Sequence, residues 1–133
     1  SWVDKQERVW ICDRQNNRIQ IFNSEGKFLN QWTDLLLPAS LAIDKKEEIV
    51  YVSEISRRVS IFTIEGKLLA RWGEGTYIQR STDGQEEDPP PLFLAPHAIA
   101  VDSRGDIYVG EIASGVGGVD RGARTVQKFA RKT

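Results

Sequence analysis

Residues 58–69 have the sequence Arg-Val-Ser-Ile-Phe-Thr-Ile-Glu-Gly-Lys-Leu-Leu, and the same pattern stands forty positions earlier. There, residues 18–29 are Arg-Ile-Gln-Ile-Phe-Asn-Ser-Glu-Gly-Lys-Phe-Leu, and Trp32 falls on Trp72 at the same offset. The sequence match extends without a gap over the whole unit, which predicts an internal repeat of about forty residues.

A third copy follows after an insertion. Residues 96–102, Pro-His-Ala-Ile-Ala-Val-Asp, match Pro-Ala-Ser-Leu-Ala-Ile-Asp at 38–44. After a one-residue deletion the match continues at residues 107–111 and 125–129. The repeat therefore predicts a single unit of 133 residues in three copies, at about 1–33, 38–73 and 96–133, with a loop insertion at 74–95.

Each copy has the pattern of short strands. The β-branched and aromatic segments of the second copy predict strands at 41–43, 48–53, 58–63 and 67–72. Glu-Gly-Lys between them is typical of a hairpin turn that needs a positive φ. Four strands per forty residues is typical of a propeller blade, so we predict an all-β fold of three four-stranded antiparallel blades. The aromatic residues expected to pack between blades are Phe22, Phe62, Phe129, Trp32 and Trp72.

Composition excludes several classes of protein. The chain is 40% hydrophobic and 28% charged, with a net charge of -1, so there is no bulk field to attract nucleic acid or an anionic membrane. Its single cysteine, Cys12, excludes an internal disulfide framework. A membrane-spanning helix needs about 20 consecutive apolar residues, and the apolar runs here are much shorter. We expect neither nucleic acid nor a membrane as a partner.

Two stretches carry a family resemblance. Residues 96–111 and 13–28 resemble NHL repeats, which build six-bladed propellers in most members. Within that group the chain is most similar to the peptidyl-α-hydroxyglycine α-amidating lyases, zinc enzymes that split a peptide carbinolamide into an amide and glyoxylate. The resemblance implies that His97 is a zinc ligand and that Arg14 is the active-site arginine. Because the chain has one histidine, with Ala39 at the matching position of the second blade, it cannot form that family's three-histidine site alone.

Topology predicts a common face for the candidate residues. Loops that enter inner strands and loops that leave second strands lie on the same face of a propeller. His97 begins an inner strand, Arg14, Glu54 and Glu111 end second strands, and Tyr77 lies in the insertion. We therefore predict a ligand site formed by Arg14, Glu54, Tyr77 and Glu111. Two alternatives stay open: His97 hydrogen-bonds a loop carbonyl instead of a metal, and Arg14 pairs with Asp13, Glu54 or a neighbouring blade instead of an anionic ligand.

Three blades leave a ring open, because propellers close with about four to eight. Either the chain is a piece of a larger propeller, or a homodimer closes a six-bladed ring; we prefer the dimer because two-fold dimers are the commonest assemblies. The predicted function is a lyase-like but non-enzymatic module that binds a small molecule, peptide or partner on its loop face. The first alternative is a zinc-dependent lyase in an assembled or full-length form, and zinc is the cofactor of that alternative only. The second alternative is a scaffold for protein or RNA.

Overall fold

A computed structural model describes residues 1–73, 75, 92–112 and 125–131 of the chain. In these ranges the chain forms eleven β-strands and one short 3-10 turn, η1 (Arg14–Asn16). The described ranges contain no helix long and apolar enough to cross a membrane. The predicted all-β class is confirmed.

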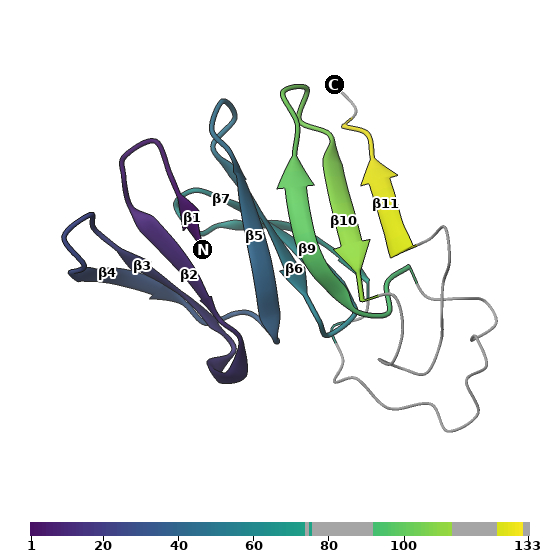
Figure 1. Cartoon of the computed structure of the whole chain (residues 1–133), viewed down its shortest axis with the longest axis horizontal. Coiled ribbons are helices and arrows are strands. Elements are labelled where there is room, and N and C mark those ends of the chain that lie inside the picture. Colours follow the sequence, from purple (N-terminus) through teal and green to yellow (C-terminus); the bar gives the residue numbers. More distant parts are fainter. Residues whose placement is uncertain (74, 76–91, 113–124, 132–133) are drawn as a thin grey trace.

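The strands form three antiparallel sheets, and within each sheet they follow chain order from one edge to the other (Figure 1). The first sheet holds β1 (Trp2–Val3), β2 (Val9–Asp13), β3 (Arg18–Phe22) and β4 (Phe28–Trp32). The second holds β5 (Pro38–Asp44), β6 (Ile49–Glu54), β7 (Arg58–Thr63) and β8 (Leu68–Gly73). The described part of the third holds β9 (Pro96–Val101), β10 (Ile107–Glu111) and β11 (Val126–Phe129).

Glycine sets the turns between the third and fourth strands of the first two sheets. Gly26 and Gly66 have φ values of 85° and 101°, so the predicted positive φ is confirmed at both. In the first sheet, Asn23 accepts hydrogen bonds through its side chain from two backbone N–H groups of the turn. In the second, the hydroxyl of Thr63 accepts one from the N–H of Lys67. These contacts place the outer strands beside the third strands.

Cross-strand pairing corrects the gap-free superposition of the first two copies. Val9 lies opposite Phe22, whereas Val50 lies opposite Phe62, so Val9 corresponds to Val50 and not to Ile49. The turn before β2 is one residue shorter than the turn before β6, and the loop after β2 is one residue longer. The two differences cancel, which is why an ungapped offset of 40 holds on either side of β2 and fails within it.

An aspartate lies in the first turn of every sheet. Asp4, Asp44 and Asp102 each accept hydrogen bonds from two backbone N–H groups of their turns. A second oxygen accepts the indole N–H of Trp10 in the first sheet and the hydroxyl of Tyr108 in the third, at 2.9 and 3.0 Å. Burial opposes ionisation of Asp4, but these hydrogen bonds outweigh it and hold the pKa of that carboxyl below its ordinary value.

The core lies between successive sheets. One apolar cluster joins the first sheet to the second, and another joins the second to the third. Trp32 packs on Phe62 with ring centroids 5.0 Å apart, and Trp72 packs on Phe129 at 5.1 Å, as predicted. Phe22 differs from the prediction: its ring packs on Phe28 of its own sheet, since no described sheet lies against that face of the first sheet.

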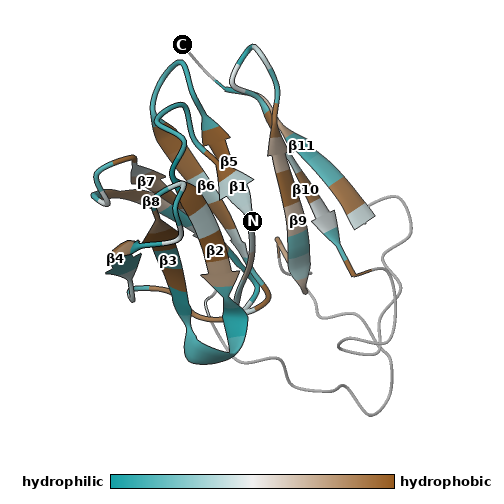
Figure 2. Ribbon diagram, turned by 60° about the vertical axis from the view of Figure 1, so that its left-hand side comes forward, coloured by the Kyte–Doolittle hydropathy of each residue, from teal (hydrophilic) through white to brown (hydrophobic). Residues whose placement is uncertain are grey.

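Antiparallel order brings connections of the same kind to the same end of the molecule. Figure 1 shows η1, the starts of β5 and β9 and the end of β10 together at one end. We call this the loop end; its described residues are 13–18, 33–38, 54–58, 92–97 and 111–112. Hydropathy coloring in Figure 2 shows polar residues gathered in the turn between β2 and β3, whereas apolar residues dominate the strand interiors.

Candidate functional site

An acidic residue ends the second strand of every sheet at the loop end. Asp13, Glu54 and Glu111 are equivalent, because each lies at the last paired position of its strand. Their exposure differs sharply: Glu54 is fully buried and Glu111 is 8% exposed, whereas the side chain of Asp13 is 25% exposed. The three carboxylates therefore occupy one repeat position in different environments.

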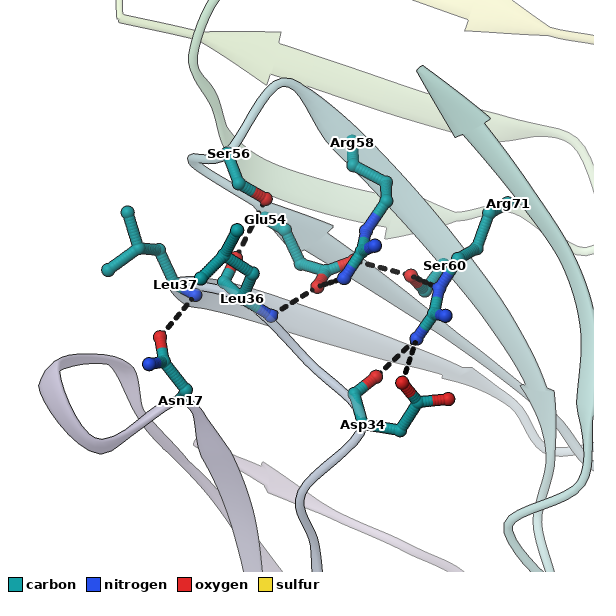
Figure 3. Close-up of polar contacts among 9 residues, drawn as sticks. All are labelled: Asn17, Asp34, Leu36, Leu37, Glu54, Ser56, Arg58, Ser60 and Arg71. Carbon is teal, nitrogen blue, oxygen red and sulfur yellow. Dashed lines mark hydrogen bonds and ion pairs between the residues drawn. The ribbon is translucent and has the colours of Figure 1, made fainter. Parts of the chain in front are cut away.

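Glu54 holds the connection between the first two sheets (Figure 3). Its Oε1 accepts the backbone N–H of Leu36 at 2.7 Å and the guanidinium of Arg58 at 2.6 Å. Its Oε2 accepts Arg58 Nε at 2.9 Å and the hydroxyl of Ser60. Ser56 donates to the carbonyl of Leu36 at 2.8 Å. A buried carboxylate needs such partners, and here they fix the chain that leads into β5.

A second arginine extends this network toward the surface. Arg71 Nε donates to Ser60 Oγ at 3.0 Å, and its other end reaches the backbone carbonyl of Asp34. The side chain of Asp34 forms an ion pair with Arg71 at 3.2 Å (Figure 3). On the other side of the connection, Asn17 accepts the N–H of Leu37 at 2.9 Å. Residues 34–37 are thus held to both sheets.

Glu111 holds the segment that leads into the third sheet in a similar way. Its Oε1 accepts the backbone N–H groups of Leu94 and Ala95 at 2.6 and 3.1 Å. The carbonyl of Ala95 accepts the N–H of Ile112 at 3.1 Å. Glu54 and Glu111, both predicted as ligand-binding residues, therefore position the segments that enter the inner strands β5 and β9.

Asp13 pairs with Arg18 and not with Arg14. Arg18 Nε lies 2.7 Å from Asp13 Oδ2, and Asn16 donates to both carboxylate oxygens. The hydrogen bonds from Arg18 and Asn16 hold the pKa of Asp13 below its ordinary value. The alternative in which Arg14 pairs with Asp13 or Glu54 is therefore wrong, since those carboxylates have other partners.

Arg14 and His97 are the exposed candidates at the loop end. Arg14 lies in η1, and its side chain has no hydrogen bond or ion pair with any described residue. His97 is exposed near the start of β9, in the second position of the strand. Tyr77 lies outside the described residues. Arg14 and His97 thus lie at the same end of the molecule, and both are exposed, whereas Glu54 and Glu111 are buried.

The residues of the chain do not fit a three-histidine zinc site. His97 is the single histidine of the sequence, and Ala39 occupies the equivalent position before Ser40 in β5. Among the described residues there is no group of three or more histidine, cysteine or acidic side chains that could hold a metal ion. Cys12 is half-buried, and burial raises the pKa of its thiol to about 11.

Sequence reasoning missed the arginine and serine partners of Glu54. Arg58, Ser60 and Arg71 lie on β7 and β8, which carry none of the predicted site residues. A usable signal was present: a basic residue follows the acidic residue at the start of the third strand in both of the first two sheets, as Arg18 and Arg58. The ungapped sequence alignment hid this signal, because it aligned Asp13 with Ser53 instead of Glu54.

Comparison with known proteins identifies the fold. Neither a family model nor a curated protein matches the chain. Among solved structures, hydrazine synthase of Kuenenia stuttgartiensis matches at 15% identity and a TM-score of 0.62, over 95% of this chain and 33% of that one. Virginiamycin B lyase from Staphylococcus aureus matches at 12% identity and 0.59, over 99% and 40%. The Dos1 propeller matches at 12% identity and 0.52, over 95% and 34%.

These likenesses define a class of protein. The three sheets are blades of a β-propeller, stacked face to face in chain order. The chain spans about a third to two fifths of the length of these structures. At such identities the likeness concerns the fold alone, and the NHL and amidating-lyase resemblance stays a prediction.

Proposed function

We propose that the chain is a propeller module that binds an anionic group of a small molecule or peptide at its loop end. One observation carries the proposal: Arg14 presents an exposed guanidinium there, with no polar partner among the described residues. A guanidinium recognises carboxylate or phosphate through its planar set of donors. Binding residues on loops held by a rigid scaffold are typical of such folds.

The buried carboxylates support this proposal by making the surface around Arg14 rigid. Glu54 fixes the connection that leads from the first blade into the second, and Asn17, three residues after Arg14, holds the same connection. A preorganised surface loses less conformational entropy when it binds. In this proposal Glu54 and Glu111 are positioning residues, and Arg14 is the residue that touches the ligand.

The test uses acetate, hippurate and inorganic phosphate as separate probes against isotope-labelled chain in NMR titrations. We expect saturable shifts in residues 13–18 and 33–37, and at least a fivefold loss of affinity in Arg14→Ala. Arg104→Ala is the matched control, because Arg104 is an exposed arginine in a turn at the opposite end. Equal effects of the two variants, or no saturable shift with any probe, would refute the proposal.

A zinc-dependent lyase in an assembled form is the second candidate. It is favoured by the exposure of His97 beside the start of an inner strand, and by the names of similar structures, which include a streptogramin B lyase. We propose as its assembly the homodimer that closes a six-bladed ring. Sedimentation would show a mass near twice 15.0 kDa, and dialysed protein would retain zinc that His97→Ala loses. A monomer without zinc and without turnover of α-hydroxyglycine peptides would exclude this candidate.

A further inference from the structure

The connection between the first two blades is held differently from its counterpart before the third. Leu37 and Ala95 are equivalent, because each precedes the proline that begins an inner strand. Glu111 of the third blade accepts the N–H of Ala95 at 3.1 Å. The N–H of Leu37 instead donates to the side-chain oxygen of Asn17, a residue of the preceding blade, at 2.9 Å (Figure 3). This hydrogen bond crosses from one blade to the next.

The repeat position of Asn17 explains the difference. Asn17 and Arg57 are equivalent, because each lies directly before the third strand of its blade and each has a positive φ, 55° and 68°. An amide side chain offers a carbonyl oxygen, whereas a guanidinium has donors only. The side chain of Arg57 therefore cannot accept an N–H from the connection that follows its blade, and Glu111 accepts it there. The cross-blade hydrogen bond thus depends on asparagine at position 17.

Residues of the second blade hold the other backbone groups of the same connection. Glu54 accepts the N–H of Leu36 at 2.7 Å, and the Ser56 hydroxyl donates to the carbonyl of Leu36 at 2.8 Å. The N–H of Ile55 donates to the carbonyl of Leu37 at 2.9 Å. Leu37 has a φ of 55°, which is unfavourable for a leucine and persists only where surrounding contacts impose it. The shape of this connection therefore depends on its hydrogen bonds.

Asn17 also closes the turn that carries Arg14. It ends η1, and its backbone N–H donates to the carbonyl of Arg14 at 3.1 Å. The side chain of Asn17 thus joins the Arg14 turn to residues 36–37, and those residues are held by the second blade. We infer that Asn17 is the positioning residue of the anion site: it transmits the order of the second blade to Arg14 through a continuous chain of hydrogen bonds. The inference rests on the proposed function, in which Arg14 touches the ligand.

The first experiment compares glycine variants of two neighbouring asparagines in the same loop. Asn17→Gly keeps the positive φ and removes the side-chain acceptor. Asn16→Gly is the matched control, because the Asn16 side chain contacts Asp13 of its own blade. In NMR hydrogen exchange on isotope-labelled chain, the N–H of Leu37 is expected to exchange about fivefold faster in Asn17→Gly and to change little in Asn16→Gly. Asn17→Asp, which keeps a side-chain oxygen, is expected to retain the slow exchange.

A double-mutant cycle tests transmission between the two blades. Ser56→Ala removes one hydrogen bond from the second blade to the connection. In the wild-type background it is expected to speed exchange of the residue-17 N–H about threefold, because the connection loosens. In the Asn17→Gly background it is expected to have no further effect on that N–H, because the link is already broken. An equal effect of Ser56→Ala in both backgrounds, or no effect in either, would overturn the inference.

Anion affinity separates this inference from the proposed function. The probe is whichever of acetate, hippurate and inorganic phosphate binds most tightly to the wild type. Its affinity is expected to fall about fivefold in Asn17→Gly and to change little in Asn16→Gly, with circular dichroism to show that both are folded. Equal affinities in the two variants would overturn the inference and leave the proposed function standing. If no probe binds to the wild type, the proposed function fails, and the exchange cycle alone decides whether Asn17 couples the two blades.

Discussion

Removal of the Glu54 carboxylate is expected to destabilise the fold strongly, whereas removal of its repeat-equivalent Asp13 is expected to change little. Both carboxylates pair with the arginine that begins the third strand of their blade, so the chemistry is the same. The pairs differ in burial: the side chains are 0% and 15% exposed for Glu54 and Arg58, and 25% and 34% for Asp13 and Arg18. The comparison therefore contrasts a buried pair with a pair that is partly open to solvent.

Loss of one partner of a buried pair costs about 3–5 kcal/mol, because the other charge stays buried without compensation. Arg58 keeps partial contact with water, which favours the lower part of that range. Glu54→Ala also leaves the N–H of Leu36 without its acceptor, which adds about 1 kcal/mol. We expect a loss of about 4 kcal/mol in the free energy of unfolding. For Asp13→Ala we expect a much smaller loss, since a pair that is partly open to solvent contributes little.

Urea denaturation followed by tryptophan fluorescence measures both effects, because Trp10 and Trp32 are buried in the core. A double variant, Glu54→Leu with Arg58→Met, is expected to recover much of the stability lost in Glu54→Ala, since it removes the uncompensated charge. Equal losses in Glu54→Ala and Asp13→Ala would show that burial does not control the contribution of this pair, and the reasoning would fail.

Three further outcomes are expected. The pKa of Asp4 is lower in the folded state than its unfolded value of about 3.9, so the stability that its carboxylate gives to the fold is present above the unfolded value. This contribution is lost as the pH falls through the folded value, and the urea midpoint of unfolding should therefore fall in acid. The variant Asp4→Asn should show a weaker dependence of the midpoint on pH. Gly73→Ala should be much more destabilising than Gly26→Ala in thermal unfolding: both glycines have positive φ, but an added Cβ at Gly73 would lie 2.1 Å from the carbonyl oxygen of Arg57, and one at Gly26 would meet nothing within 4 Å. With a pKa of about 11, Cys12 should react with a disulfide reagent at pH 8 roughly a hundredfold more slowly than an ordinary thiol, and urea should remove the difference.

The local sequence pattern predicted the strands and turns because each of them recurs in more than one copy of the repeat. The outer segments at 28–32 and 68–73 and their glycine turns follow directly from Glu-Gly-Lys and the alternating residues around it. The one-residue offset in β2 was not predictable in the same way, because a shorter turn and a longer loop cancel in sequence and show only in cross-strand pairing. Phe22 was placed between blades by analogy with Phe62, but its face of the first blade has no described neighbour.

The candidate site was predicted less well because its function depends on burial. Glu54 and Glu111 lie at positions where a ligand-binding residue is expected. Only the contacts in the structure show that their carboxylate oxygens accept hydrogen bonds from backbone N–H groups and, for Glu54, from Arg58. The partner of Asp13 is decided by the loop between β2 and β3, where η1 directs Arg14 away and Arg18 takes the paired position. Sequence spacing alone does not separate those two arginines.

The second blade is the one described blade with apolar clusters on both of its faces. When the stability of a stack is the sum of contributions from blades and from interfaces, the blade with two interfaces is coupled to both of its neighbours. Among the described residues the first and third blades each contribute to one such cluster, so opening of either of them breaks fewer contacts than opening of the second. Native-state exchange should therefore be slower in β6 and β7 than in the described strands of the first and third blades.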